Sequence, residues 1–194
     1  MKRIVTSALL IGAVFTLLSG CAGYQLGSVK PSVYAGIDNI HVPMFANNTL
    51  EPRVSSLVTN AVLKEIQADG TYKVTNRQNC DAILVGRIRQ ISKRQLRAIR
   101  TDTLRSKELR LFLYVDWHFE DPSTGRRIDS LDRSEGDSKI DREDDKVYKA
   151  RPGRVIGETI QIVDPSFQVS ERNAIAVAAQ DAAKKIVSQA ANGW

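Results

Sequence analysis

Residues 108–120 read ELRLFLYVDWHFE and hold the cleanest alternation of apolar and polar side chains in the chain. One side of the stretch carries Leu109, Leu111, Leu113, Val115, Trp117 and Phe119. The other side carries Arg110, Tyr114, Asp116, His118 and Glu120, with Phe112 as the exception. Alternation of this length predicts a strand in a sheet that is buried on one face and wetted on the other. Trp117 is therefore assigned to the core, with contact to a partner as the alternative for its ring.

The segments around this strand predict further strands. Residues 81–91 place Leu84, Gly86 and Ile88 on one side, with Arg87 and Arg89 on the other. Shorter strands are predicted within 37–45 and 71–76, and DPSTG at 121–125 predicts a turn before a strand that starts in 126–131. The polar stretch from 129 to 170 predicts no clear element.

Two amphipathic helices flank these strands. The first is predicted over Pro52–Gln67, with Gly70 capping its end and an apolar face of Val54, Leu57, Val58, Ala61, Val62 and Ile66. The second covers 170–190, with Ser170 as its N-cap and a buried stripe of Ile175, Ala178, Ala179, Ala182 and Ile186. The predicted class is α+β, a two-layer sandwich with both helices on one face of a mixed or antiparallel sheet of four or more strands.

The N-terminus carries a secretion signal. Lys2 and Arg3 precede a mostly apolar stretch over 4–18, and Leu18-Ser19-Gly20-Cys21 follows. This pattern describes a cleaved signal, because the apolar run is too short for a comfortable bilayer span. The four residues are similar to the bacterial lipobox, which implies cleavage before Cys21 and acylation of its thiol and new amine. Ala22 in place of Asp implies the outer membrane, and a plain secretion signal is the alternative.

These features divide the chain into a signal peptide over 1–20, a lipidated tether over 21–36 and a single domain over 37–194, with 136–169 as an expected insertion. Cleavage leaves 174 of the 194 residues, enough for one well-buried domain. It also lowers the formal charge from +6 to +4, which by itself says little about partners. Lipidation of Cys21 leaves Cys80 without a disulfide partner, and we expect Cys80 to be a small buried side chain.

Residues 87–110, called the basic hairpin below, hold nine basic and two acidic side chains, a net charge of +7. The basic members are Arg87, Arg89, Lys93, Arg94, Arg97, Arg100, Arg105, Lys107 and Arg110. Arginine binds phosphate in a bidentate geometry, which favours an anionic partner. The alternative is a solvated hairpin whose charges keep its edges from pairing. Nucleic acid is disfavoured, because the loop has no interleaved aromatic residues to stack bases.

No catalytic or metal-binding pattern is present. Residues 120–146 hold ten acids against six bases, but DREDD at 141–145 lacks the spacing of an EF-hand, so a solvated loop is expected. His41 and His118, the only histidines, have no partners spaced for a tetrahedral metal site. No nucleophile motif or phosphate-binding glycine loop is found, so the sequence predicts neither an enzyme nor a cofactor.

Several stretches together resemble one family. They are GYQL after Cys21, VPMFANNTLEP before the first helix, CDAILVGRI, LRLFLYVDWHFEDPSTGRR and SERNAIAVAAQDAAKKIV. These stretches resemble the lipopolysaccharide-assembly lipoprotein LptE family. The resemblance implies a lipid-anchored protein at the periplasmic face of the outer membrane. It also implies a partner and plug role in the β-barrel LptD, delivery of lipopolysaccharide (LPS) to the cell surface, and pairing of basic side chains with LPS phosphates.

A second class of function stays open. The IHVPMFANNT stretch and the helix that follows it also resemble self-assembling secretion or scaffold lipoproteins, related to curli export and to the amino-terminal domain of TolB. A defined homo-oligomer would favour this alternative. An envelope hydrolase would need a nucleophile and a base that the sequence does not provide.

Overall fold

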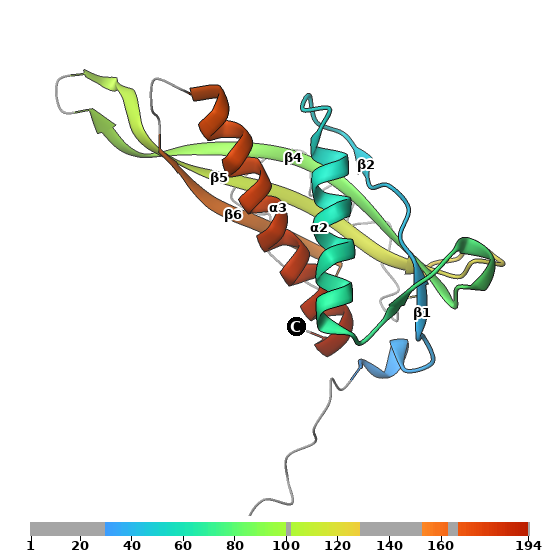
Figure 1. The fold of residues 1–194 in the computed structure, drawn as a ribbon. Helices are drawn as coiled ribbons and strands as arrows, with labels where there is room; N and C mark the ends of the chain where they lie inside the picture. Colours follow the sequence, from blue (N-terminus) through green and yellow to red (C-terminus); the bar gives the residue numbers. More distant parts are fainter. Residues whose placement is uncertain (1–29, 100–101, 129–152, 163–166, 194) are drawn as a thin grey trace, which may run out of the picture.

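The computed structural model describes residues 30–99, 102–128, 153–162 and 167–193. Within these ranges the chain forms two α-helices, six strands and two 3-10 helices (Figure 1). In order, the elements are η2 (Ser32–Tyr34), β1 (Asn39–His41), β2 (Ala46–Asn47), α2 (Val54–Asp69), β3 (Lys73–Val74), η3 (Arg77–Asn79), β4 (Ala82–Ile99), β5 (Asp102–Glu120), β6 (Arg154–Ile162) and α3 (Phe167–Asn192).

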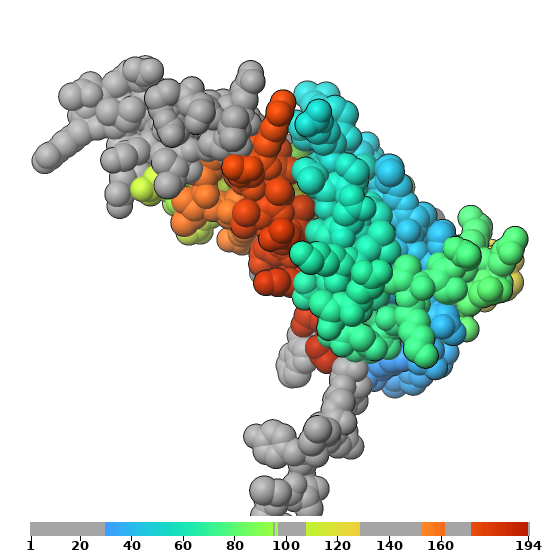
Figure 2. Space-filling view, in the orientation of Figure 1, coloured from blue at the N-terminus to red at the C-terminus, as the bar shows by residue number. Residues whose placement is uncertain are grey.

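The strands form one mixed sheet in the order β3-β1-β4-β5-β6, and β2 pairs with β4 beside this path. β1 runs parallel to β3 and β4, whereas β4, β5 and β6 are antiparallel neighbours. The long strands curl along their length, and α2 and α3 lie side by side against the sheet (Figures 1 and 2). The predicted α+β class is confirmed, and the finer description as a two-layer sandwich stays a prediction.

The apolar side of residues 108–120 forms part of the hydrophobic core. Five of its six predicted apolar residues are buried in the core, and Leu109 is only half-buried: the buried five are Leu111, Leu113, Val115, Trp117 and Phe119. Trp117 is 2 % exposed, and its Nε1 donates to Gln189 Oε1 of α3 at 3.0 Å. The core assignment of Trp117 is therefore confirmed, since the indole N–H finds an acceptor inside the fold.

Hydroxyl groups of α2 hold the strand segment that precedes it. Ser55 Oγ donates to the carbonyl of Phe45 at 2.8 Å, and the N–H of Phe45 donates to Thr59 Oγ1 at 3.0 Å. The Phe45 ring lies directly over Gly86, where a Cβ would overlap it. In the ANNT turn, Asn47 Oδ1 accepts from the N–H of Thr49 at 2.8 Å. The turn thereby delivers the chain into α2.

The second helix packs very closely on β6. Gly157 faces Ala178 and Ala182 of α3, and a Cβ at 157 would overlap the carbonyl oxygen of Ala178. The predicted stripe of α3, from Ile175 to Ile186, is buried at every position. This contact depends on small residues on both elements, because a helix and a strand approach closely only when few side-chain atoms separate them.

Several local predictions need correction. α3 already begins at Phe167, so Ser170 lies inside the helix and is not its N-cap. α2 begins at Val54, with Pro52 in the turn before it, whereas Gly70 caps its end as predicted with φ of 77°. Cys80 is half-buried rather than buried, and its Sγ donates to the carbonyl of Arg77 at 3.2 Å. β6 forms within the segment 136–169, where the sequence predicts only an insertion; the insertion itself stays a prediction.

Candidate functional site

Lys30 is the first described residue and lies within the tether predicted over 21–36; Cys21, the proposed lipidation site, lies outside the described residues. Lys30 Nζ donates to the carbonyl of Ile37 at 2.7 Å and pairs with Asp38 Oδ1 at 2.6 Å. The same ammonium group sits 5.0 Å from the centroid of the Tyr72 ring. The Lys30 side chain thus contacts both the segment just before β1 and the segment after α2.

Two further groups fix this end of the molecule. The hydroxyl of Tyr72 donates to the carbonyl of Ala190 near the end of α3 at 2.6 Å. Burial, with smaller contributions from Tyr34 and two nearby carboxylates, raises the pKa of Tyr72 above its usual range. Asp81 Oδ2, just before β4, accepts from the N–H groups of Asn39 and Asp38 at 2.7 and 3.1 Å, and these bonds lower the pKa of Asp81.

The basic hairpin is formed by the far ends of β4 and β5, which extend beyond the helices (Figure 1). Arg87, Lys93, Arg94 and Arg110 are exposed. Arg97, Arg105 and Lys107 lie on these strands but their side chains are outside the described part, as is Arg100 altogether. The hairpin predicted from the sequence is therefore present.

Arg89 has a different role from its neighbours. Its Nη1 pairs with Asp116 Oδ2 at 3.0 Å, and Arg154 Nε pairs with Asp116 Oδ1 at 3.2 Å. The Arg154 side chain is only 8 % exposed, so this cluster ties β4, β5 and β6 together on the face away from the helices. Sequence reasoning grouped Arg89 with the ligand-binding residues and missed Arg154, because Arg154 belongs to the segment that showed no pattern.

Aromatic side chains adjoin the exposed cations on the same sheet face. The guanidinium of Arg94 lies 5.5 Å from the centroid of the Phe112 ring. Phe112 stacks on Tyr114, with ring centroids 6.4 Å apart and an interplanar angle of 26°. This explains why Phe112 breaks the alternation of β5, since its ring supports an arginine rather than the core.

The described residues offer no metal site. No group of three or more histidine, cysteine, aspartate or glutamate side chains is placed to hold an ion within the described ranges. His41 Nδ1 contacts the carbonyl of Thr75 at 3.2 Å, and His118 Nε2 contacts Glu120 Oε1 at 2.7 Å. None of the helices in these ranges combines the length and apolar character needed to cross a membrane.

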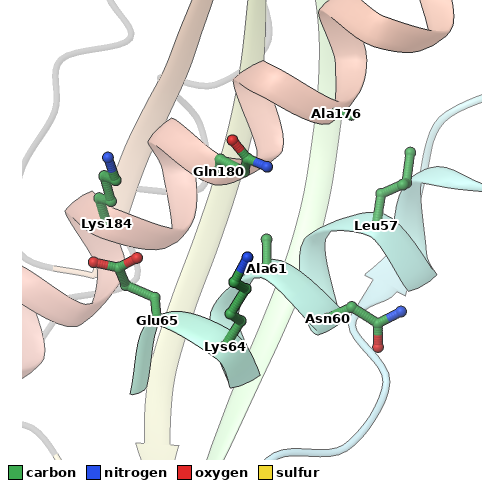
Figure 3. Close-up of a pocket in the computed structure, with 8 residues that line it drawn as sticks. All are labelled: Leu57, Asn60, Ala61, Lys64, Glu65, Ala176, Gln180 and Lys184. Atoms are coloured by element: carbon green, nitrogen blue, oxygen red, sulfur yellow. The ribbon is translucent and has the colours of Figure 1, made fainter. Parts of the chain in front are cut away.

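A shallow groove of about 440 Å³ runs between the outer sides of α2 and α3 (Figure 3). Its lining residues are Leu57, Asn60, Ala61, Lys64, Glu65, Ala176, Gln180 and Lys184. The groove mixes apolar, amide and oppositely charged groups.

A family model described as "LptE: Lipopolysaccharide-assembly" matches residues 37–190. No curated protein matches the chain significantly. Among solved structures, a minor lipoprotein from Acinetobacter baumannii has a TM-score of 0.47 and 14 % identity, covering 78 % of this chain and 91 % of that one. A PelC dodecamer from Paraburkholderia phytofirmans has a TM-score of 0.44 and 13 % identity, covering 80 % and 88 %. A putative lipoprotein from Caulobacter crescentus has a TM-score of 0.41 and 16 % identity, covering 76 % and 87 %.

Proposed function

The chain belongs to the LptE family of lipopolysaccharide-assembly proteins, and on that premise we propose that it is an outer-membrane lipoprotein that assists LPS transport to the cell surface. In this proposal acyl chains on Cys21 anchor it to the periplasmic leaflet, and it is the partner and plug of the β-barrel LptD. The family match over residues 37–190 is the observation that carries the proposal. The role is one of binding and positioning, with no reaction catalysed.

The position of the tether supports this arrangement. Eight residues lie between Cys21 and Lys30, so the nine Cα-to-Cα steps reach at most about 30 Å. Lys30 is linked through Asp38 to Asp81 just before β4, and the exposed Arg94 lies 13 residues further along that strand. Thirteen strand residues span roughly 40 Å. In this proposal Arg94 and the residues beyond it point away from the anchoring leaflet, toward the barrel lumen.

We place the LPS contact on the basic hairpin. Lipid A phosphates are anionic, and arginine forks match phosphate oxygens better than lysine does. Arg94 lies over Phe112, which pre-orients the guanidinium and leaves its N–H edges exposed. Arg89 contributes to the fold through Asp116 and takes the smaller share of any ligand contact.

Reversing the charge of the hairpin is expected to weaken LPS binding by at least about tenfold, because several charge-assisted bonds become repulsive. The variant is Arg94→Glu, Arg97→Glu and Arg100→Glu together, and the measurement is equilibrium binding of purified protein to purified LPS. The matched control reverses Lys64 and Lys184, which line the groove on the helix side. Equal affinity of the hairpin variant and the wild type would remove the hairpin from the binding surface.

The alternative of a self-assembling secretion or scaffold lipoprotein is not favoured by the family match. The two proposals differ in what the protein binds. An LPS-assembly partner is expected to be recovered with a barrel, whereas a scaffold would be recovered chiefly with copies of itself.

A further inference from the structure

We infer that the free edge of β6, from Glu158 to Ile162, is a strand-addition site for an extended segment of the protein's barrel partner. This inference rests on the proposed function for the identity of the partner. β6 is the last strand of the sheet order, and no strand among the described residues lies on its outer side. An edge strand presents a row of main-chain N–H and C=O groups that another strand can pair with.

The hydrogen bonds of β6 show which groups point outward. The N–H of Trp117 on β5 donates to the carbonyl of Gly153. The main-chain N–H and C=O groups of odd-numbered β6 residues therefore point toward β5, and those of even-numbered residues point away from it. The N–H of Glu158 instead donates to Asp181 Oδ2 at 2.9 Å, and the carbonyl of Ile156 accepts from Lys185 Nζ at 2.8 Å. Because the pattern alternates in an antiparallel strand, the main-chain groups of Ile160 also point away from β5.

The helix α3 seals only the first half of this edge. Asp181 and Lys185 pair with each other at 2.7 Å and reach the Glu158 N–H and the Ile156 carbonyl. Together they supply one acceptor and one donor, as a residue of a neighbouring strand would. The carbonyl of Glu158 and both main-chain groups of Ile160 lie beyond this pair, and the Ile160 side chain is 58 % exposed. Glu158 and Ile160 are thus exposed, and no strand among the described residues covers this second half of the edge.

A second observation marks the same end of β6. Gln161 is 2 % exposed, and neither its Oε1 nor its Nε2 has a hydrogen-bond partner in the structure. Buried amides are almost always paired, so this one indicates a region whose polar contacts are incomplete. A strand added beside β6 brings side chains to the same face as Gln161.

The neighbouring charges indicate the chemistry of the occupant. Exposed Arg110 pairs in register with Ile160 across β5 and β6, close to Arg94 over Phe112. Main-chain pairing requires an extended segment. The cations beside Ile160 favour acidic side chains at that point of the segment, and the exposed Glu158 favours a basic side chain at its other end. The partner that the proposed function supplies is a protein built from strands and strand-connecting loops, which satisfies the first requirement.

The most specific test is Ile160→Pro, which removes one outward N–H without removing a bond to β5. Tagged full-length protein would be purified from outer-membrane detergent extracts, and barrel recovery would be compared with the wild type and with Ile160→Val, which keeps the N–H. We expect about tenfold less barrel with Ile160→Pro, since both main-chain pairing and close approach are lost. LPS binding and Tm should stay close to the wild-type values.

Unchanged barrel recovery with a folded Ile160→Pro variant would overturn the strand-addition site and leave the proposed function standing. Absence of barrel with the wild type would instead overturn the proposed function. If Ile160→Pro does not fold, thiol-to-amine crosslinking from Ile160→Cys in a Cys80→Ser background decides the matter, with Lys184→Cys as the matched control. A crosslink to the barrel from position 160 alone supports the site; no crosslink, or a crosslink to a second copy, contradicts it.

Discussion

Replacing Gly157 with alanine is expected to lower the free energy of unfolding by about 3 kcal/mol, the upper part of the range for overpacked cores. The added methyl group would overlap the carbonyl of Ala178 and approach the Cβ of Ala182 to 2.9 Å. The first neighbour is helix backbone, which cannot rotate away, so α3 must move off β6. For a chain of this size the Tm should fall by roughly 6–12 °C, measured by thermal unfolding of the signal-free protein.

Gly36→Ala is the matched control, because nothing lies within 4 Å of a Cβ at that position. Neither Gly157 nor Gly36 has a positive φ, so both substitutions leave the backbone conformation accessible. We expect Gly36→Ala to be neutral or slightly stabilising. A Tm for Gly157→Ala within about 2 °C of the wild type would show that α3 and β6 are not packed this closely.

Cys21→Ser is expected to remove the protein from the outer-membrane fraction, because the variant gains no acyl chains and keeps its signal peptide. A serine hydroxyl does not accept the diacylglycerol, and cleavage of the signal as a lipoprotein depends on that modification. Several acyl chains at about 0.8 kcal/mol per buried CH₂ group hold a protein on a membrane effectively without release. The measurement is fractionation of cell envelopes, combined with the intact mass of the purified wild-type protein.

The second cysteine supplies the control for this experiment. Cys80 is half-buried at the entrance to β4, and its Sγ donates to the carbonyl of Arg77. Cys80→Ser should therefore stay in the membrane fraction. Presence of Cys21→Ser in the outer-membrane fraction at the wild-type level, together with an unacylated mass for the wild type, would contradict the anchor.

Much of the fold was predictable from the sequence because its apolar residues recur with a clear strand or helix period. β5 alternates over its apolar half, and α2 repeats Val54, Val58, Val62 and Ile66 at helical spacing, all of which are buried. β6 was not predictable, because its helix-facing positions include Gly157 and Gln161 rather than large apolar residues. Close packing by α3 requires a residue without a side chain at 157, and this glycine together with the polar Gln161 removes the alternation that would reveal a strand.

The candidate site was predictable in its charge but not in its contacts. Nine basic residues in one hairpin could be counted from the sequence. The roles of Arg89 and Arg154 depend on Asp116, which lies on a strand between theirs, so only the strand order reveals the cluster. The position of Arg94 over the Phe112 ring likewise depends on the register between β4 and β5. A bulge between Ile88 and Gln90 shifts this register by one residue.

Recovery of the barrel with the tagged wild-type protein, from mild detergent extracts of outer membranes, tests the central proposal most directly. We expect LptD to be the major protein recovered, in a stable complex that survives size-exclusion chromatography. Recovery of this protein alone, or only with copies of itself, would contradict its assignment as the barrel's partner.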